Sequence, residues 1–294
     1  MQTKNQIRQL LESVGIEPNK RLGQHFLVDL NLMRLLVDSA DIQNNDIVLE
    51  VGCGTGSLTE ALVARAGRVV AIEIDKNLFG LLQKQLGQNE NLDLINSDVL
   101  KSKHTINQNV VNALSVARKK FSGRFLLVAN LPYNIACPLM INLVTGPMIA
   151  DAMFVTVQKE VADRMTAQTA SGDYGILSIL LKATGDVETI RILKPSVFWP
   201  HPQVDSAMVK FNRDRKKSNR IKNIDLFTEM VHHFFAHRRK TLLSSSRMFH
   251  GRLERVQKWL EIFEKCSINP SLRPEQISPD EYINIARNIE KISD

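Results

Sequence analysis

The sequence lacks the features that mark membrane and secreted proteins. No stretch approaches the ~18 apolar residues that a bilayer-spanning helix needs. The first twenty residues combine Glu12 and Glu17 with sparse basic residues, unlike a signal or transit peptide. With 294 residues, of which 44% are hydrophobic and 23% charged, we expect a soluble cytoplasmic protein with one large core and a smaller second unit.

Cysteine is also scarce. Cys53, Cys137 and Cys266 are odd in number and far apart, and the chain contains no C-x-x-C pair. A disulfide framework or a cysteine-based zinc site needs paired, closely spaced cysteines, so we expect reduced thiols. His233 and His237 have the i, i+4 spacing of metal ligands, but their neighbours are basic and no acidic motif accompanies them. We therefore predict no metal site.

Net positive charge is nearly absent from the first two-thirds of the chain and gathers in the last third. Residues 1–194 hold 20 Lys and Arg against 19 acids, whereas residues 195–294 hold 18 against 12. Phosphate neutralisation supplies much of the nonspecific affinity for nucleic acid, so a polyanion is the expected partner of the last third. A solvated basic surface is the alternative.

Short apolar and β-branched runs alternate with helix-length segments from about residue 29 onward. The segments SLTEALVARA and NLFGLLQKQL have the apolar spacing of helices. This β-α-β-α order is typical of a parallel sheet with helices on both faces, so we predict an open α/β sheet. Its expected strands are DIVLEV (46–51), RVVAIEI (68–74), NLDLI (91–95), RFLLVAN (124–130) and AMFVTVQ (152–158).

Two further strands and a helical tail follow. DVETIRIL (186–193) and VDSAMVKF (204–211) are joined by a Pro-rich loop, which predicts a closing antiparallel hairpin. The charged stretch after them predicts a domain boundary, with one domain over 1–212, a linker over 213–223 and a helical domain over 224–294. Helices of the tail are expected in DLFTEMVHHFFAHRRKTLLSS, RLERVQKWLEIF and SPDEYINIARNIEKI.

A glycine-rich turn joins the first predicted strand to a helix. This turn, EVGCGTG from Glu50 to Gly56, lets the backbone approach a ligand closely. Its G-x-G-x-G spacing and its leading acid suit a methionine-linked nucleoside rather than a pyrophosphate. A plain strand-to-helix turn is the alternative for the loop taken alone.

Polar side chains also end the next three strands. Glu73 lies about twenty residues past the glycines, where an acid can accept both hydrogen bonds of a ribose diol. Asp98 can accept a hydrogen bond from an adenine amino group, and Asn130 ends the fourth strand. Because ligands bind at the carboxyl edge of such sheets, we predict that these residues share one crevice. The alternatives are a helix N-cap for Asp98 and a surface acid for Glu73.

In this order, the glycine loop, Glu73, Asp98 and N-L-P-Y (130–133) resemble a class I S-adenosylmethionine-dependent methyltransferase that acts on an exocyclic amine. Further blocks resemble the ribosomal RNA adenine dimethyltransferase family, which dimethylates two adjacent adenines in the 3′-terminal hairpin of small-subunit ribosomal RNA. The resemblance implies a Rossmann-like, mostly parallel seven-stranded sheet with an antiparallel closing strand, and a small helical C-terminal domain. The blocks are KRLGQHFL (20–27), NLPYNIACPL (130–139), VQKEV (157–161), YG (174–175), FWPHPQVDS (198–206), FAHRRKT (235–241) and LRPEQISPDEY (272–282).

The resemblance assigns residues to the cofactor and to RNA. It implies S-adenosylmethionine as the cofactor, bound by a catalytic domain over 1–212, and an RNA-binding role for 224–294. The implied cofactor contacts are His25, Leu27, Gly52, Glu73, Asp98 and Asn130. The RNA contacts are expected at a helix end that carries Arg238, Arg239 and Lys240.

The N-L-P-Y segment carries the expected chemistry, because adenine N6 is a weak nucleophile whose lone pair is delocalised into the ring. The side-chain oxygen of Asn130 and the main-chain carbonyl of Leu131 can accept the two amino hydrogens and favour a more tetrahedral nitrogen. Pro132 restricts Leu131 and helps to aim that carbonyl. Tyr133 and Phe198 are expected to stack on the two faces of the extruded base. The alternative is a Pro-terminated strand with both rings in the core.

Two other functions stay open. Large-subunit adenine methyltransferases that confer macrolide resistance share the cofactor loop and an N-[LI]-P-[YF] motif, but the helical tail and the FAHRRKT and FWPHPQVDS blocks favour the small-subunit group. A noncatalytic RNA-binding assembly or transcription factor on the same scaffold would not need Asn130 or Glu73. We expect a monomer whose partner is small-subunit ribosomal RNA in the pre-30S particle. The segment between Asp98 and Phe125 is long for the family.

Overall fold

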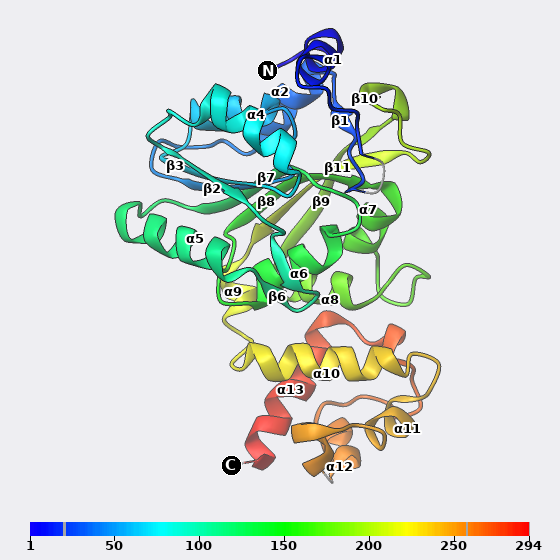
Figure 1. Ribbon diagram of the computed structural model, residues 1–294. Coiled ribbons are helices and arrows are strands. Elements are labelled where there is room, and N and C mark those ends of the chain that lie inside the picture. Colours follow the sequence, from blue (N-terminus) through cyan, green and yellow to red (C-terminus); the bar gives the residue numbers. More distant parts are fainter. Residues whose placement is uncertain (20–21, 257, 294) are drawn as a thin grey trace. The chain divides into compact units, whose positions relative to one another are not determined.

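The computed structural model describes residues 1–19, 22–256 and 258–293, and Lys20 and Arg21 of the KRLGQHFL block lie outside them. The chain forms two compact units, which are described separately below (Figure 1). Among the described residues, no helix combines the length and apolar character needed to cross a bilayer. The first unit is Met1–Ala162 with Glu188–Asn212, and the second is Asp163–Val187 with Arg213–Asp294.

A seven-stranded sheet forms the centre of the first unit, in the order β4-β3-β2-β7-β8-β11-β9. The strands from β4 to β8 pair in parallel, and β11 pairs antiparallel to β8, with Ser206 opposite Gln158. The predicted mostly parallel sheet with an antiparallel closing strand is thus confirmed. The bounds are β2 Ile47–Val51, β3 Arg68–Glu73, β4 Leu92–Asn96, β7 Phe125–Asn130, β8 Ala152–Gln158, β9 Gly185–Leu193 and β11 Ser206–Arg213.

Helices cover both faces of this sheet, which explains why most of its parallel strands are nearly continuous apolar runs. Every residue of β2 is buried. Leu36, Leu62 and Leu82 of α2, α3 and α4 belong to one apolar cluster with alternate residues of the strands. Helix α5 packs on β2, β3 and β4 from the other side (Figure 1). The bounds are α1 Lys4–Ser13, α2 Leu30–Ser39, α3 Ser57–Val63, α4 Lys76–Leu86, α5 Gln108–Lys120, α6 Ala136–Thr145 and α7 Lys159–Thr166.

The order of the strands determines where a ligand can bind. From β2 the chain builds outward through β3 and β4, and it then returns to the other side of β2 to form β7 and β8. The connections after β2 and β7 therefore diverge to opposite faces of the sheet. Such a switch point leaves a crevice at the carboxyl ends of the two strands.

Two short strand pairs lie outside the sequence prediction, because runs of two or three residues are too short to show a period. β1 (Phe26–Leu27) pairs antiparallel with β10 (Phe198–Trp199), so that Leu27 lies opposite Phe198. β5 (Leu100–Ser102) and β6 (Thr105–Ile106) form a hairpin. This hairpin and α5 account for the long segment between Asp98 and Phe125.

The second unit is helical and has an aromatic core. Phe234 contacts Phe249, Trp259 and Tyr282, with ring centroids 4.8, 5.9 and 5.9 Å away. Tyr174, from the segment that precedes β9, is buried in the same unit and donates a hydrogen bond to the Ile277 carbonyl at 2.8 Å. The bounds are α8 Ile176–Thr184, α9 Arg215–Ser218, α10 Ile224–Ala236, α11 Leu242–Ser246, α12 Trp259–Lys265 and α13 Pro279–Ser293.

The helix predicted through FAHRRKT is wrong in its extent. Helix α10 ends at Ala236, and α11 begins only after Thr241, whose side chain caps it by accepting from Ser244 N at 3.2 Å. The intervening residues are turn and bend. The apolar spacing stops over HRRKT, so these positions have no apolar face to bury and packing does not extend the helix through them.

Candidate active site

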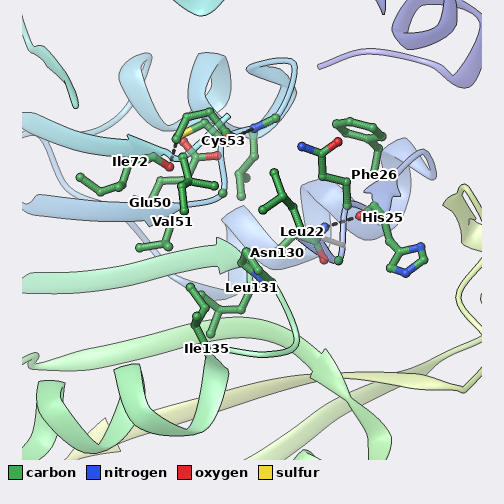
Figure 2. Close-up of a pocket in the computed structure, with 18 of the residues that line it drawn as sticks. Leu22, His25, Phe26, Glu50, Val51, Cys53, Ile72, Asn130, Leu131 and Ile135 are labelled. Carbon is green, nitrogen blue, oxygen red and sulfur yellow. Dashed lines mark hydrogen bonds between the residues drawn. The ribbon is translucent and has the colours of Figure 1, made fainter. Parts of the chain in front are cut away.

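A pocket lies at the carboxyl ends of β2, β3 and β7 in the first unit (Figure 2). Its walls come from the loop before β1, from the turns after these three strands and from the segment after β4. The structure thus brings together segments far apart in the sequence. The predicted site residues that line the pocket are His25, Leu27, Gly52, Glu73, Asp98, Asn130, Leu131, Pro132 and Tyr133.

The glycine loop needs glycine for two reasons. Gly52, Gly54 and Gly56 have φ angles of +78°, +59° and +83°, a region that other residues rarely adopt. A Cβ atom at Gly54 would also lie 2.7 Å from Cε1 of Phe26. The loop therefore packs tightly against its neighbours and leaves its backbone open to the pocket.

Glu73 is fixed by two backbone donors at the end of β3. Gly54 N donates to Oε2 at 2.8 Å, and Asp75 N donates to Oε1 at 2.9 Å. Only 4% of the residue is exposed. Burial raises the pKa of Glu73, and the two N–H donors oppose that rise. Each oxygen keeps acceptor capacity for a further donor, which fits the two hydroxyls of a ribose.

Glu50, the acid ahead of the glycine loop, is buried more deeply. It is 1% exposed, and its Oε2 atom has no hydrogen-bond partner among the described residues. Burial, with a smaller effect from the nearby Glu73 charge, raises the pKa of Glu50 to about 8. An unpaired buried oxygen beside a glycine cradle fits a ligand that carries a donor or a positive charge.

The far side of the pocket fits a purine base. Ile74 is 46% exposed there, and Val99 adds a second apolar side chain. The exposed Asp98 accepts a hydrogen bond from Leu100 N at 2.9 Å, and the buried Ser97 Oγ has no partner among the described residues. Ser97 and Ile74 are not predicted as site residues from the sequence, although each directly adjoins a residue that is.

Asn130 is held from two sides at the end of β7. Its Nδ2 donates to the His25 carbonyl at 2.8 Å, and its Oδ1 accepts from the Thr156 hydroxyl of β8 (Figure 2 shows the first of these bonds). Leu131 N donates to the Thr156 carbonyl at 3.1 Å. The Leu131 carbonyl accepts no hydrogen bond from the described residues. Two acceptors of the kind predicted for an amine are therefore adjacent, and one of them is unused.

Tyr133 is oriented by its hydroxyl and its ring. The hydroxyl lies 2.7 Å from Ser206 Oγ, and the ring stacks on that of His25 with centroids 5.6 Å apart. His25 Nδ1 lies 2.7 Å from the Pro200 carbonyl, which can only accept, so Nδ1 carries the hydrogen. Desolvation raises the pKa of Tyr133. A base can stack on this tyrosine only on the face that His25 leaves open.

Phe198 is not brought to the pocket. Its side chain is fully buried in the apolar cluster that contains Leu27 and Met208. β10 places it opposite Leu27, and that pairing directs it into the core. In this arrangement Phe198 cannot stack on a base in the pocket. Its position agrees with the alternative interpretation of the sequence, in which the ring belongs to the core.

The predicted RNA contacts lie in the turn after α10 of the second unit. Arg238 is engaged within that unit, since it donates to the Gly172 carbonyl at 3.1 Å and lies 3.5 Å from Glu275. Arg239 and Lys240 are exposed. Among the described residues, Arg238 has an acidic partner and Arg239 and Lys240 have none, so these two are the cations that remain available to RNA.

Residues 16–291 match the profile described as "Ribosomal RNA adenine dimethylase". The chain belongs to this family. It is 37% identical over 284 residues to the Clostridium perfringens "Ribosomal RNA small subunit methyltransferase A", covering 97% of this chain and 95% of the relative. The protein of the same name from Ligilactobacillus salivarius is 33% identical over 286 residues, covering 97% and 94%.

Two solved structures show the same fold. A dimethyladenosine transferase from Plasmodium falciparum superimposes with a TM-score of 0.73 at 24% identity, covering 92% of this chain and 98% of the other. The 23S rRNA methyltransferase ErmE gives a TM-score of 0.60 at 21% identity, covering 90% and 99%. Family membership confirms the predicted activity class. This adenine dimethylase is an S-adenosylmethionine-dependent methyltransferase that acts on ribosomal RNA.

Proposed function

We propose that the protein dimethylates N6 of two adjacent adenines in the 3′-terminal hairpin of small-subunit ribosomal RNA, within the pre-30S particle. The observation that carries this proposal is the pair of acceptors, Asn130 Oδ1 and the Leu131 carbonyl, in the same pocket as the glycine loop. The small-subunit assignment is supported by the names of the curated relatives, which cover nearly the whole chain.

The cofactor contacts follow from the donor and acceptor set of the pocket. The backbone at Gly52 would face the methionine part, Glu73 the ribose, and Asp98 the adenine amino group, with Ile74 and Val99 against the base. His25, Leu27 and Asn130 complete the set. S-adenosylmethionine, when bound, supplies an electrophilic methyl group on a positively charged sulfur.

The chain itself positions the target amine. Asn130 Oδ1 and the Leu131 carbonyl accept its two hydrogens, so the lone pair is drawn out of conjugation and faces the methyl donor. Tyr133 stacks on the base, which is worth roughly 1 to 3 kcal/mol. No strong general base is required, because the methylated nitrogen is acidic and water takes its proton. For the second transfer the base rotates, and one hydrogen remains for the two acceptors.

The experiment uses pre-30S particles that lack these methyl groups. Wild-type protein with labelled cofactor should yield dimethyladenosine after nuclease digestion. Asn130→Ala should lower the transfer rate at least ~100-fold with an unchanged circular dichroism spectrum, whereas the exposed Asn112→Ala should match wild type. Absence of dimethyladenosine with the wild-type protein would refute the proposal, and label in large-subunit RNA would favour the macrolide-resistance type of enzyme.

A further inference from the structure

Thr156 hydrogen-bonds to both residues that supply the acceptors of the amine site, yet it belongs to none of the motifs that mark the site in the sequence. It lies on β8 directly opposite Asn130 in the register of the sheet, and it is fully buried. Its hydroxyl donates to Asn130 Oδ1, and its carbonyl accepts Leu131 N at 3.1 Å. One residue of the neighbouring strand therefore holds the side chain of Asn130 and the backbone of Leu131.

The partners of Asn130 leave its amide only one orientation. The His25 carbonyl can only accept, so the Asn130 atom that faces it at 2.8 Å must be Nδ2. Oδ1 then faces Thr156, whose hydroxyl can rotate to donate. An amide oxygen can accept two hydrogen bonds, so Oδ1 keeps one site for an amino hydrogen.

Removal of the Thr156 hydroxyl would delete one of the two hydrogen bonds that hold the Asn130 amide. The amide would keep its bond to the His25 carbonyl, but rotation about its side-chain torsion would no longer be opposed at Oδ1. A partly buried oxygen would also lose its donor. The Leu131 contact uses the Thr156 main chain, so a change of side chain leaves it intact and isolates the effect on Asn130.

We propose that Thr156 is a positioning residue that orients the Asn130 amide so that Oδ1 can accept a hydrogen of the target amine. This inference rests on the role proposed for Asn130. Thr156 itself is not among the residues that line the pocket. Its contribution should therefore appear in the transfer step far more than in the binding of the particle or of the cofactor, of which Asn130 is one of several proposed contacts.

The test compares Thr156→Val, which keeps the shape and loses the hydroxyl, with Thr156→Ser, which keeps the hydroxyl. Single-turnover transfer at saturating cofactor and particle should be roughly tenfold slower for Thr156→Val. It should return to within about threefold of wild type for Thr156→Ser. The cofactor Kd and the particle Kd should stay within about twofold for both variants. Thr145→Val is the matched control, because the Thr145 hydroxyl donates only to the Ile141 carbonyl within α6, and it should transfer at the wild-type rate.

A double-mutant cycle separates this inference from the function on which it rests. Thr156→Val added to Asn130→Ala should cause no further loss, because the residue acts through Asn130. A wild-type rate for Thr156→Val, a failure of serine to restore the rate, or additive losses in the cycle would each overturn the inference. If the proposed function is wrong, the wild-type protein itself will produce no dimethyladenosine in small-subunit RNA. The Thr156 variants are then compared on whichever RNA the wild-type protein methylates.

Discussion

Gly52 and Pro132 pack closely against each other in the lining of the pocket, although 79 residues lie between them in the sequence. A Cβ atom at Gly52 would lie 2.9 Å from Cγ and 3.0 Å from Cδ of the proline ring. Gly52 belongs to the glycine loop proposed to hold the cofactor, and Pro132 is the residue proposed to aim the Leu131 carbonyl. The two halves of the site thus meet at a contact that only hydrogen at Cα permits.

Replacement of Gly52 by alanine should therefore damage both halves. The φ angle of +78° is strained for alanine, and the new methyl group would displace Pro132. We expect a loss of roughly 1 to 3 kcal/mol in unfolding free energy and weaker cofactor binding, measured by urea unfolding and calorimetric titration. Gly80→Ala in α4 is the control, since a Cβ there meets nothing within 4 Å, and it should leave cofactor affinity unchanged. Equal affinities for the two variants would contradict the prediction.

Glu50 should make stability depend on pH. Its pKa is about 8 in the folded protein against 4.5 ordinarily, so the folded state holds the proton more tightly. The associated stability is complete below pH ~4.5 and is lost as pH rises toward 8. Glu50→Gln removes the titrating group, so its stability relative to wild type should rise by on the order of 4 kcal/mol from pH 5 to pH 9. Parallel urea-unfolding profiles would refute this, and the exposed Glu90→Gln serves as the control.

Arg239 and Lys240 should carry more of the salt-dependent RNA affinity than Arg238, which is bound within its own unit. Changing Arg239 and Lys240 together to alanine should weaken particle binding and reduce the slope of log Kd against log salt by roughly 0.7 to 0.9 per lost phosphate contact. Arg238→Ala should change the slope less. Particle binding measured from low to high salt tests this, and an unchanged slope in the double variant would exclude the turn as an RNA contact.

Tyr174 should stabilise the helical unit through its hydroxyl. The ring is buried, and the hydroxyl donates to the Ile277 carbonyl at 2.8 Å. Tyr174→Phe leaves that carbonyl without its donor and should cost about 1 to 2 kcal/mol of unfolding free energy. Ser218→Ala is the control, because the Ser218 hydroxyl makes only a long hydrogen bond to the Arg215 carbonyl, at 3.4 Å, and it should change stability by less than about 0.5 kcal/mol. Equal denaturation midpoints for Tyr174→Phe and wild type would show that the bond contributes nothing.

The parallel strands were predictable because most of them are apolar runs, and all but β2 end in a polar residue. Glu73 and Asn130 end β3 and β7, as their position after such runs indicates. Phe198 could not be placed in the same way. The Pro-rich sequence around Phe198 indicates a loop at the site. In the structure, the short strand β10 pairs with β1, and this pairing places the Phe198 side chain in the core. A pair of two-residue strands has no periodicity that a sequence can show.

The sequence by itself determined the sheet, the crevice at its carboxyl edge and the family, because strand patterns and local motifs are properties of contiguous residues. Tertiary structure alone decided which atoms hold the site residues. Thr156 lies beside Asn130 because β7 pairs with β8. Asp163–Val187 belongs to the helical unit although Glu188–Asn212, which follows it in the sequence, belongs to the first unit. Such contacts depend on packing between distant segments, and no local pattern records them.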